Sequence, residues 1–272
     1  MTDFLQSMAR SSRERAALLP ATYPDAALDK PVFPLRLNTF DIIAEIKDAS
    51  PAEGVLTSGH CDRKQRALDY AHGGAAAISI LTEPSKFAGE IGHLEEVAAT
   101  VASLKLPVMR KDFLVDTRQI IEARASGASG VLVIAAMLDD RELASMLDCA
   151  LDHSLFVLLE SFDSRDLSRS SDFLKNTRYA DCAAAGQLLV GINTRNLRTL
   201  RVDPARLQQL SNELPAGVIA VAESGQTSPD DVARVAGWGY SMALVGTALM
   251  RSEIPRELLA DMRAAGRKNR QA

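Results

Sequence analysis

The stretch DIIAEIKDASP, residues 41 to 51, is an apolar run that carries an acid and an amine and then ends at a proline. The run is typical of a buried β-strand, on which successive side chains point to opposite faces. Ile43, Glu45 and Lys47 therefore share one face. Because charge is costly in a protein interior, this pair indicates a polar site at the point where the strand ends.

Seven more apolar runs follow this one, at intervals of roughly 24 to 34 residues. They are AAAISILTE, LPVMRKDF, GVLVIAAML, LFVLLES, LLVGINTR, VIAVAES and MALVGTALM. Segments between them, such as residues 116–128 and 228–240, have helical spacing. Eight parallel strands alternating with helices favour a (β/α)8 TIM barrel in the α/β class. An open doubly wound sheet is the alternative, but its usual Gly-x-Gly-x-x-Gly and P-loop patterns are missing.

Composition and charge exclude several classes of protein. The chain of 272 residues is 47% hydrophobic and 24% charged, which is ordinary for a globular protein. Its net charge is −4 and its basic residues are scattered, so neither nucleic acid nor a membrane surface is an expected partner. The longest apolar run is about half of what a membrane-spanning helix requires.

The cysteines and the N-terminus predict a cytoplasmic protein. Cys61, Cys149 and Cys182 form no CxxC pair and have no histidines at metal-ligand intervals, so no disulfide or metal site is expected. The neighbouring His60 and Cys61 are expected in a solvated loop. The N-terminus has an early Asp3 and no apolar core of a secretory signal.

Polar residues gather at the ends of the predicted strands, where the chemistry of TIM barrels takes place. They are Glu45, Lys47, Lys111, Glu160, Asn193, Arg195, Glu223 and Ser224. Two lysines beside three glutamates supply proton donors and acceptors whose pKa values burial can move toward neutrality. A serine–histidine pair, a nucleophilic cysteine and a metal cluster are all missing from this set. Proton-transfer chemistry without a cofactor is the function that remains.

The last two strands end in residues that suit a phosphate group. Ser224, Gly225, Gly246 and Thr247 follow these strands, and glycine lets backbone N–H groups approach a ligand closely. Arg195 and Lys47 add positive charge. The alternative is that the glycines only form tight turns.

With these residues assembled, the chain resembles the indole-3-glycerol phosphate synthase family over about residues 38 to 255. The resemblance rests on the stretches AEIKDASPAEG, GGAAAISILTEPSKFAG, LPVMRKDFLVDTRQIIEARASGA, GINTRNLRTL, VAESG and LVGTALM. It implies ring closure, decarboxylation and dehydration of 1-(2-carboxyphenylamino)-1-deoxyribulose 5-phosphate to indole-3-glycerol phosphate, with no metal or organic cofactor. It also implies a monomer or weak homodimer, with an N-terminal extension (residues 1–37) whose helix, near 3–18, covers the mouth of a single barrel domain (residues 38–272).

The resemblance further assigns roles to individual residues. Lys111 is implied as the general acid at the ketone and Glu160 as the base of the dehydration, while Lys47 and Glu45 assist departure of the hydroxyl. Asn193 is implied as an orienting residue and Glu223 as the carboxylate that positions Lys111. The phosphate is implied to lie against Gly225, Gly246 and Thr247, near Lys47, Ser50 and Arg195. Pro51, Phe87, Phe113, Leu132 and Leu197 are implied to wall the aromatic ring.

The sequence also departs from the family pattern. Asp48 and Glu53 stand where relatives often have a basic residue, Gln226 replaces a usual apolar residue, and the segment 164–187 is long. Two alternatives therefore stay open: a specialised paralogue acting on a related aryl-amino phosphosugar, and a non-catalytic phosphosugar-binding barrel. An intact acid and base argue against the second, since binding alone has no need of them.

Overall fold

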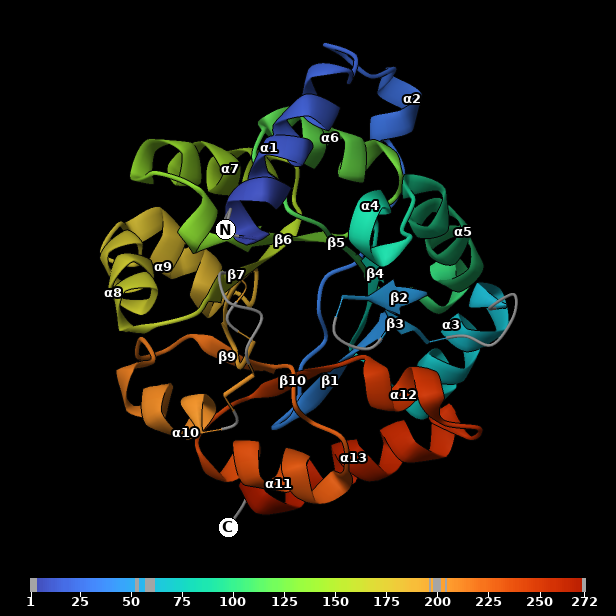
Figure 1. The fold of residues 1–272 in the computed structure, drawn as a ribbon, viewed down its shortest axis with the longest axis vertical. Helices are drawn as coiled ribbons and strands as arrows, with labels where there is room; N and C mark the ends of the chain where they lie inside the picture. Colours follow the sequence, from blue (N-terminus) through green and yellow to red (C-terminus); the bar gives the residue numbers. More distant parts are fainter. Residues whose placement is uncertain are drawn as a thin grey trace.

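Figure 1 shows the computed structural model of the chain as a ring of strands surrounded by helices. The structure describes residues 4–51, 54–56, 62–195, 197, 202–203 and 205–270. Within these residues, parallel strands close into one barrel in the order β1, β10, β9, β8, β7, β6, β5, β4, which confirms the predicted TIM barrel. The barrel strands are β1 (Asp41–Ile46), β4 (Ala77–Leu81), β5 (Val108–Lys111), β6 (Gly130–Ile134), β7 (Phe156–Ser161), β8 (Leu188–Asn193), β9 (Ile219–Glu223) and β10 (Met242–Val245).

Each barrel strand lies within one of the eight apolar runs. Every residue of β1, β4, β6, β7, β8 and β10 is buried, because the barrel interior covers one face and the helices cover the other. Strand β1 pairs with β10 on one side, where Asp41 lies opposite Met242, and with β4 on the other, where Ile43 lies opposite Ala77. This double pairing closes the barrel and brings all the strand ends to one mouth.

The connecting segments form the outer ring of helices seen in Figure 1. The α-helices between and after the strands are α3 (Arg63–Gly73), α4 (Pro84–Phe87), α5 (Ile91–Val101), α6 (Thr117–Ala125), α7 (Asp140–Asp152), α8 (Ser164–Phe173), α9 (Thr177–Ala184), α10 (Arg206–Leu210), α11 (Pro229–Gly237), α12 (Thr247–Arg251) and α13 (Pro255–Arg270). Three 3-10 turns accompany them in the described residues: η1 (Ala102–Leu104), η2 (Ala135–Met137) and η3 (Ser211–Glu213). The helices predicted within 116–128 and 228–240 are α6 and α11. Both begin with a capping box, formed by Asp116 with Gln119 and by Ser228 with Asp231.

In the described residues before the barrel there are two helices, α1 (Phe4–Ala17) and α2 (Asp25–Leu28). Helix α1 matches the helix predicted near residues 3–18 and lies on the side of the barrel occupied by α6 and α7 (Figure 1). Its residues Leu5, Met8 and Ala9 belong to the same hydrophobic core as the barrel. The division into an extension and a barrel domain at residue 37 stays a prediction.

A short hairpin follows β1, in which β2 (Ala49–Ser50) pairs antiparallel with β3 (Gly54–Val55). Cys149 and Cys182 have free thiols, whereas His60 and Cys61 lie outside the described residues. In the described part of the chain, no helix is long and apolar enough to cross a membrane.

Candidate active site

A cavity of about 390 Å³ opens at the carboxyl ends of the barrel strands. This volume lies in the range of small-molecule sites, roughly 300 to 1,000 Å³. Its lining includes every predicted site residue except Glu160: Glu45, Lys47, Ser50, Pro51, Phe87, Lys111, Phe113, Leu132, Asn193, Arg195, Leu197, Glu223, Ser224, Gly225, Gly246 and Thr247. Glu160 is fully buried and lies behind this lining, in contact with Asn193 and Lys111.

Glu45 and Lys47 form an ion pair at the end of β1. Lys47 Nζ lies 2.7 Å from Glu45 Oε1, and the Glu45 side chain is almost fully buried. Burial opposes the charge on Glu45, but Lys47 and Lys111 together hold its pKa below the ordinary value. The ion pair therefore fixes Glu45 and Lys47 to each other at the mouth of the barrel.

Lys111 ends β5 and carries its ammonium group among carboxylates. Its Nζ lies 4.0 Å from Glu160 Oε2. Burial opposes the charge, but Glu160, Glu45 and Glu223 together raise the pKa of Lys111 above the ordinary lysine value. The lysine is therefore fully protonated at neutral pH, which suits a proton donor.

Glu160 and Glu223 form a buried acidic pair beside this lysine. Burial raises the pKa of Glu160, and burial together with the charge of Glu160 raises the pKa of Glu223 further. Asn193 Nδ2 donates to Glu160 Oε1 at 3.2 Å, but among the described residues no donor reaches Glu160 Oε2 or either oxygen of Glu223. The pair therefore holds a proton more readily than two exposed glutamates would.

Glu223 was predicted to position Lys111. The structure has no hydrogen bond between these two side chains among the described residues, and Glu223 acts on Lys111 only through its charge. Room for the Glu223 carboxylate comes from Gly191 of β8, because a Cβ added there would lie 2.1 Å from Glu223 Oε1. The absent side chain of Gly191 thus leaves the space that the Glu223 carboxylate fills.

The predicted phosphate end of the cavity follows β9 and β10. Ser224 and Gly225 have φ angles of 65° and 89°, so two successive residues adopt the left-handed conformation. Such a conformation costs free energy for serine and is characteristic of functional sites. Gly246 precedes α12, and a Cβ there would lie 2.4 Å from Glu45 Oε1 and 3.0 Å from Lys47 Nζ. Gly246 therefore makes room for the Glu45–Lys47 ion pair.

Arg195 lines the same cavity, two residues after Asn193, the last residue of β8. Its backbone N–H donates to Asn193 Oδ1 at 2.9 Å. Within the described residues, no hydrogen bond or ion pair engages its guanidinium group, which lowers the pKa of Lys111 slightly through its charge. A cation in a cavity that has no partner among the described residues is available to an anionic ligand.

Aromatic rings form the opposite wall of the cavity. The rings of Phe87 and Phe113 have centroids 6.0 Å apart, and the ring of Phe4 meets Phe113 edge to face at 6.0 Å. Leu132 and Leu197 are buried beside the cavity and complete its apolar lining. This wall suits a flat aromatic group.

Sequence reasoning missed two features of the site. Phe4 was not singled out although α1 was predicted, because a helix boundary does not say which residue reaches the cavity. Asp112 lies between two predicted residues and was not assigned a role, although it also lines the cavity. Its side chain is completely buried and joins α1 to the barrel.

The structure shows the contacts of most residues at which the sequence departs from the family pattern. Asp48 forms an ion pair with Arg63 at the start of α3, so it faces a protein partner. Gln226 is buried in the lining of the cavity, and no described donor reaches its Oε1. The long segment 164–187 is occupied by helices α8 and α9. Glu53 lies outside the described residues.

Fold and site together define a TIM-barrel enzyme whose lysine, glutamate and arginine side chains meet at the mouth of the barrel. A model of the family described as "Indole-3-glycerol phosphate synthase" matches residues 26–262. The chain belongs to the indole-3-glycerol phosphate synthase family.

Similar proteins with this name include those of Paenarthrobacter aurescens strain TC1 and Micrococcus luteus. The first is 39% identical over 96% of this chain and 90% of its own length, and the second is 42% identical over 82% and 78%. Among solved structures, 3-hexulose-6-phosphate synthase from Salmonella typhimurium has a TM-score of 0.63 at 13% identity, covering 85% of this chain and 100% of its own. At that identity the structural likeness supports the fold alone.

Proposed function

We propose that this chain converts 1-(2-carboxyphenylamino)-1-deoxyribulose 5-phosphate to indole-3-glycerol phosphate, releasing carbon dioxide and water, as a carboxy-lyase of tryptophan biosynthesis. One observation carries the proposal. A protonated lysine, Lys111, lies beside a buried glutamate, Glu160, in a cavity with an aromatic wall and an anion-binding end. These are the groups that the reaction requires.

In the first step, the ring carbon that bears the carboxylate attacks the ketone carbon of the sugar. The ketone oxygen gains negative charge as the new carbon–carbon bond forms, and Lys111 donates a proton to it. The raised pKa of Lys111 keeps this proton available at neutral pH. Loss of carbon dioxide then restores the aromatic ring. A positioned acid of this kind contributes roughly 10² to 10⁴ to the rate.

In the second step, the hydroxyl group leaves as water and the indole forms. Glu160 accepts a proton from the intermediate, and Lys47, held by Glu45, assists departure of the hydroxyl. Asn193 orients Glu160 through its 3.2 Å hydrogen bond. Because the pKa of Glu160 is raised, this glutamate is a stronger base than an exposed one.

The remote parts of the substrate hold it in place. The backbone of Gly225, Gly246 and Thr247 and the side chains of Lys47, Ser50 and Arg195 bind the phosphate group. Pro51, Phe87, Phe113, Leu132 and Leu197 contact the anthranilate ring. Contacts to a phosphate far from the reacting carbons stabilise substrate and transition state about equally, so they lower KM more than they raise kcat.

Several further properties belong to the same proposal. The enzyme works in the cytoplasm as a monomer or weak homodimer, without a metal or organic cofactor and without nucleic-acid or membrane partners. Residues 1–37 form an extension to the catalytic barrel domain of residues 38–272.

The proposal is tested by incubating purified protein with the carboxyphenylamino substrate and following the fluorescence of the indole product. The parent is expected to form indole-3-glycerol phosphate in catalytic amounts. Glu160→Gln preserves the shape of the side chain but removes the base, so quenched reactions should contain the ring-closed, undehydrated intermediate by mass spectrometry. Only unreacted substrate with the parent, at high enzyme concentration, would contradict the proposed activity.

A further inference from the structure

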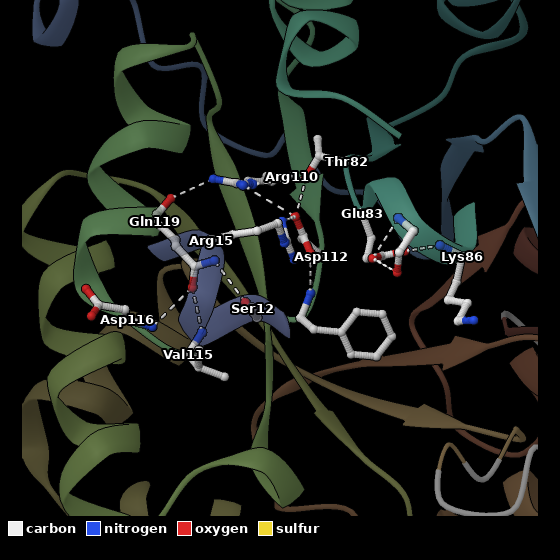
Figure 2. A network of polar contacts seen from close by, with 12 residues as sticks. Ser12, Arg15, Thr82, Glu83, Lys86, Arg110, Asp112, Val115, Asp116 and Gln119 are labelled. Carbon is white, nitrogen blue, oxygen red and sulfur yellow. Dashed lines mark hydrogen bonds and ion pairs between the residues drawn. The ribbon is translucent and has the colours of Figure 1, made fainter. Parts of the chain in front are cut away.

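Asp112 is the centre of a buried polar network between helix α1 and the barrel (Figure 2). Arg15 of α1 donates from Nη1 to Asp112 Oδ2 at 2.9 Å and from Nη2 to Oδ1 at 2.7 Å. Thr82 Oγ1 donates to Oδ2 at 2.8 Å, and Arg110 Nη2 lies 3.3 Å from the same oxygen. The carboxylate therefore receives donors from α1, from β5 and from the segment after β4.

The Asp112 carboxylate also accepts a hydrogen bond from the backbone of the next residue. Asp112 Oδ1 accepts the N–H of Phe113 at 2.7 Å. Lys111 and Phe113 flank Asp112, and both line the cavity. A rotation of the Asp112 side chain would therefore break its hydrogen bond to the peptide group between Asp112 and Phe113.

A second contact of the network lies one turn away on the same face of α1. Gln119 Nε2 donates to Ser12 Oγ at 2.9 Å, and Gln119 Oε1 accepts the N–H of Val115 at 2.9 Å (Figure 2). Phe4, near the start of α1, contacts the ring of Phe113. Helix α1 therefore holds the segment after β5 at three places along its length.

We propose that Asp112, gripped by the guanidinium of Arg15, is a positioning residue that sets Lys111 and Phe113 at the mouth of the barrel. Helix α1 thereby controls the acid of the reaction, although it supplies no proton itself. This inference rests on the proposed function. Burial would raise the pKa of Asp112, but Arg15, Arg110 and Thr82 hold it below the ordinary value. The ion pair between Asp112 and Arg15 therefore persists at neutral pH.

Arg15→Ala is the main test, because Arg15 is partly exposed and its removal leaves a space that solvent guanidinium ions can reach. Displacement of a catalytic group by about 1 Å can cost roughly 10²-fold in rate. We expect kcat to fall about 10- to 100-fold, with a smaller rise in KM. Millimolar guanidinium chloride should restore kcat to within a few-fold of the parent. Arg15→Lys keeps the positive charge but cannot donate two parallel hydrogen bonds to Asp112, so its kcat should fall several-fold. It replaces Arg15→Ala in the test if that variant does not fold.

Arg13→Ala is the matched control. Arg13 lies on the same helix and forms an exposed ion pair with Glu142 at 3.8 Å, so its removal should leave kcat unchanged and guanidinium should have no effect. A readout without substrate is the backbone amide resonance of Phe113, which should shift in Arg15→Ala and stay in place in Arg13→Ala. An unaltered Phe113 resonance, or parent kcat in a folded Arg15 variant, would overturn the proposal. An inactive parent with a shifted Phe113 resonance would contradict the proposed function and leave the positioning of this segment supported.

Discussion

Gly246→Ala places a methyl group against the Glu45–Lys47 ion pair. The added Cβ would lie 2.4 Å from Glu45 Oε1 and 3.0 Å from Lys47 Nζ. Ordinary contact begins near 3.4 Å, so the carboxylate must withdraw by about 1 Å. The φ angle of Gly246 is −120°, which is not in the left-handed region, so no positive φ excludes a side chain here. The contact of the added methyl group with the ion pair is the effect that the substitution tests.

The expected loss follows from this displacement. Moving a positioned group by about 1 Å costs roughly 10²-fold in kcat/KM, and overpacking costs about 1 to 3 kcal/mol of unfolding free energy. Steady-state kinetics with the indole fluorescence assay measures the first, and denaturant unfolding measures the second. Both values should change in the same variant.

Gly92→Ala is the control for the addition of a methyl group. A Cβ at Gly92 of α5 has no atom within 4 Å, so the change should leave kcat/KM unchanged and alter stability by less than about 1 kcal/mol. If Gly246→Ala kept the parent kcat/KM, the position of the Glu45–Lys47 pair would not matter for the reaction, and the roles of both residues would have to be withdrawn.

Four further outcomes are expected. Lys111→Ala should retain the fold and lose about 10² to 10⁴ in kcat, and a variant within a few-fold of the parent would remove this lysine from the mechanism. Arg195→Ala should raise KM roughly 10- to 100-fold with little change in kcat, and inorganic phosphate should inhibit it less; an unchanged KM would place the phosphate elsewhere. The raised pKa of Glu223 means that its contribution to stability is complete below the unfolded pKa and is lost as pH rises through the folded one. In Glu223→Gln the melting temperature should therefore fall less steeply as pH rises. An unchanged dependence of melting temperature on pH would refute the raised pKa of Glu223. Gln226→Leu should raise the unfolding free energy by about 1 kcal/mol, because Gln226 Oε1 is buried and accepts no hydrogen bond from the described residues. A fall of the unfolding free energy by the same amount would show that Oε1 does accept a hydrogen bond.

The fold could be predicted from the sequence because its strands are buried on both faces. A strand such as β7, in the run LFVLLES, is almost continuously apolar because helices cover one of its faces and the barrel interior covers the other. The carboxyl ends of the strands of a TIM barrel all meet at one mouth, so Glu45, Lys111 and Glu223 were predicted to lie together. In the structure all three line the same cavity.

Other parts of the site depend on distances that no spacing encodes. The reach of Arg15 to Asp112 spans 97 positions in the sequence, and nothing local to either residue indicates the other. Likewise, Gly191 and Gly246 were not predicted to make room for Glu223 and Glu45, because a glycine in a strand or turn gives no sign of which side chain fills its space.

The most direct test of the proposed activity uses substrate labelled with ¹³C at the carboxyl carbon. The parent enzyme should release one labelled carbon dioxide for each molecule of indole-3-glycerol phosphate formed, at a rate proportional to enzyme concentration. Lys111→Ala, measured beside it, should release both products far more slowly and in the same one-to-one ratio. Labelled carbon dioxide without indole product, or neither product at high enzyme concentration, would contradict a ring-closing decarboxylase at this barrel mouth.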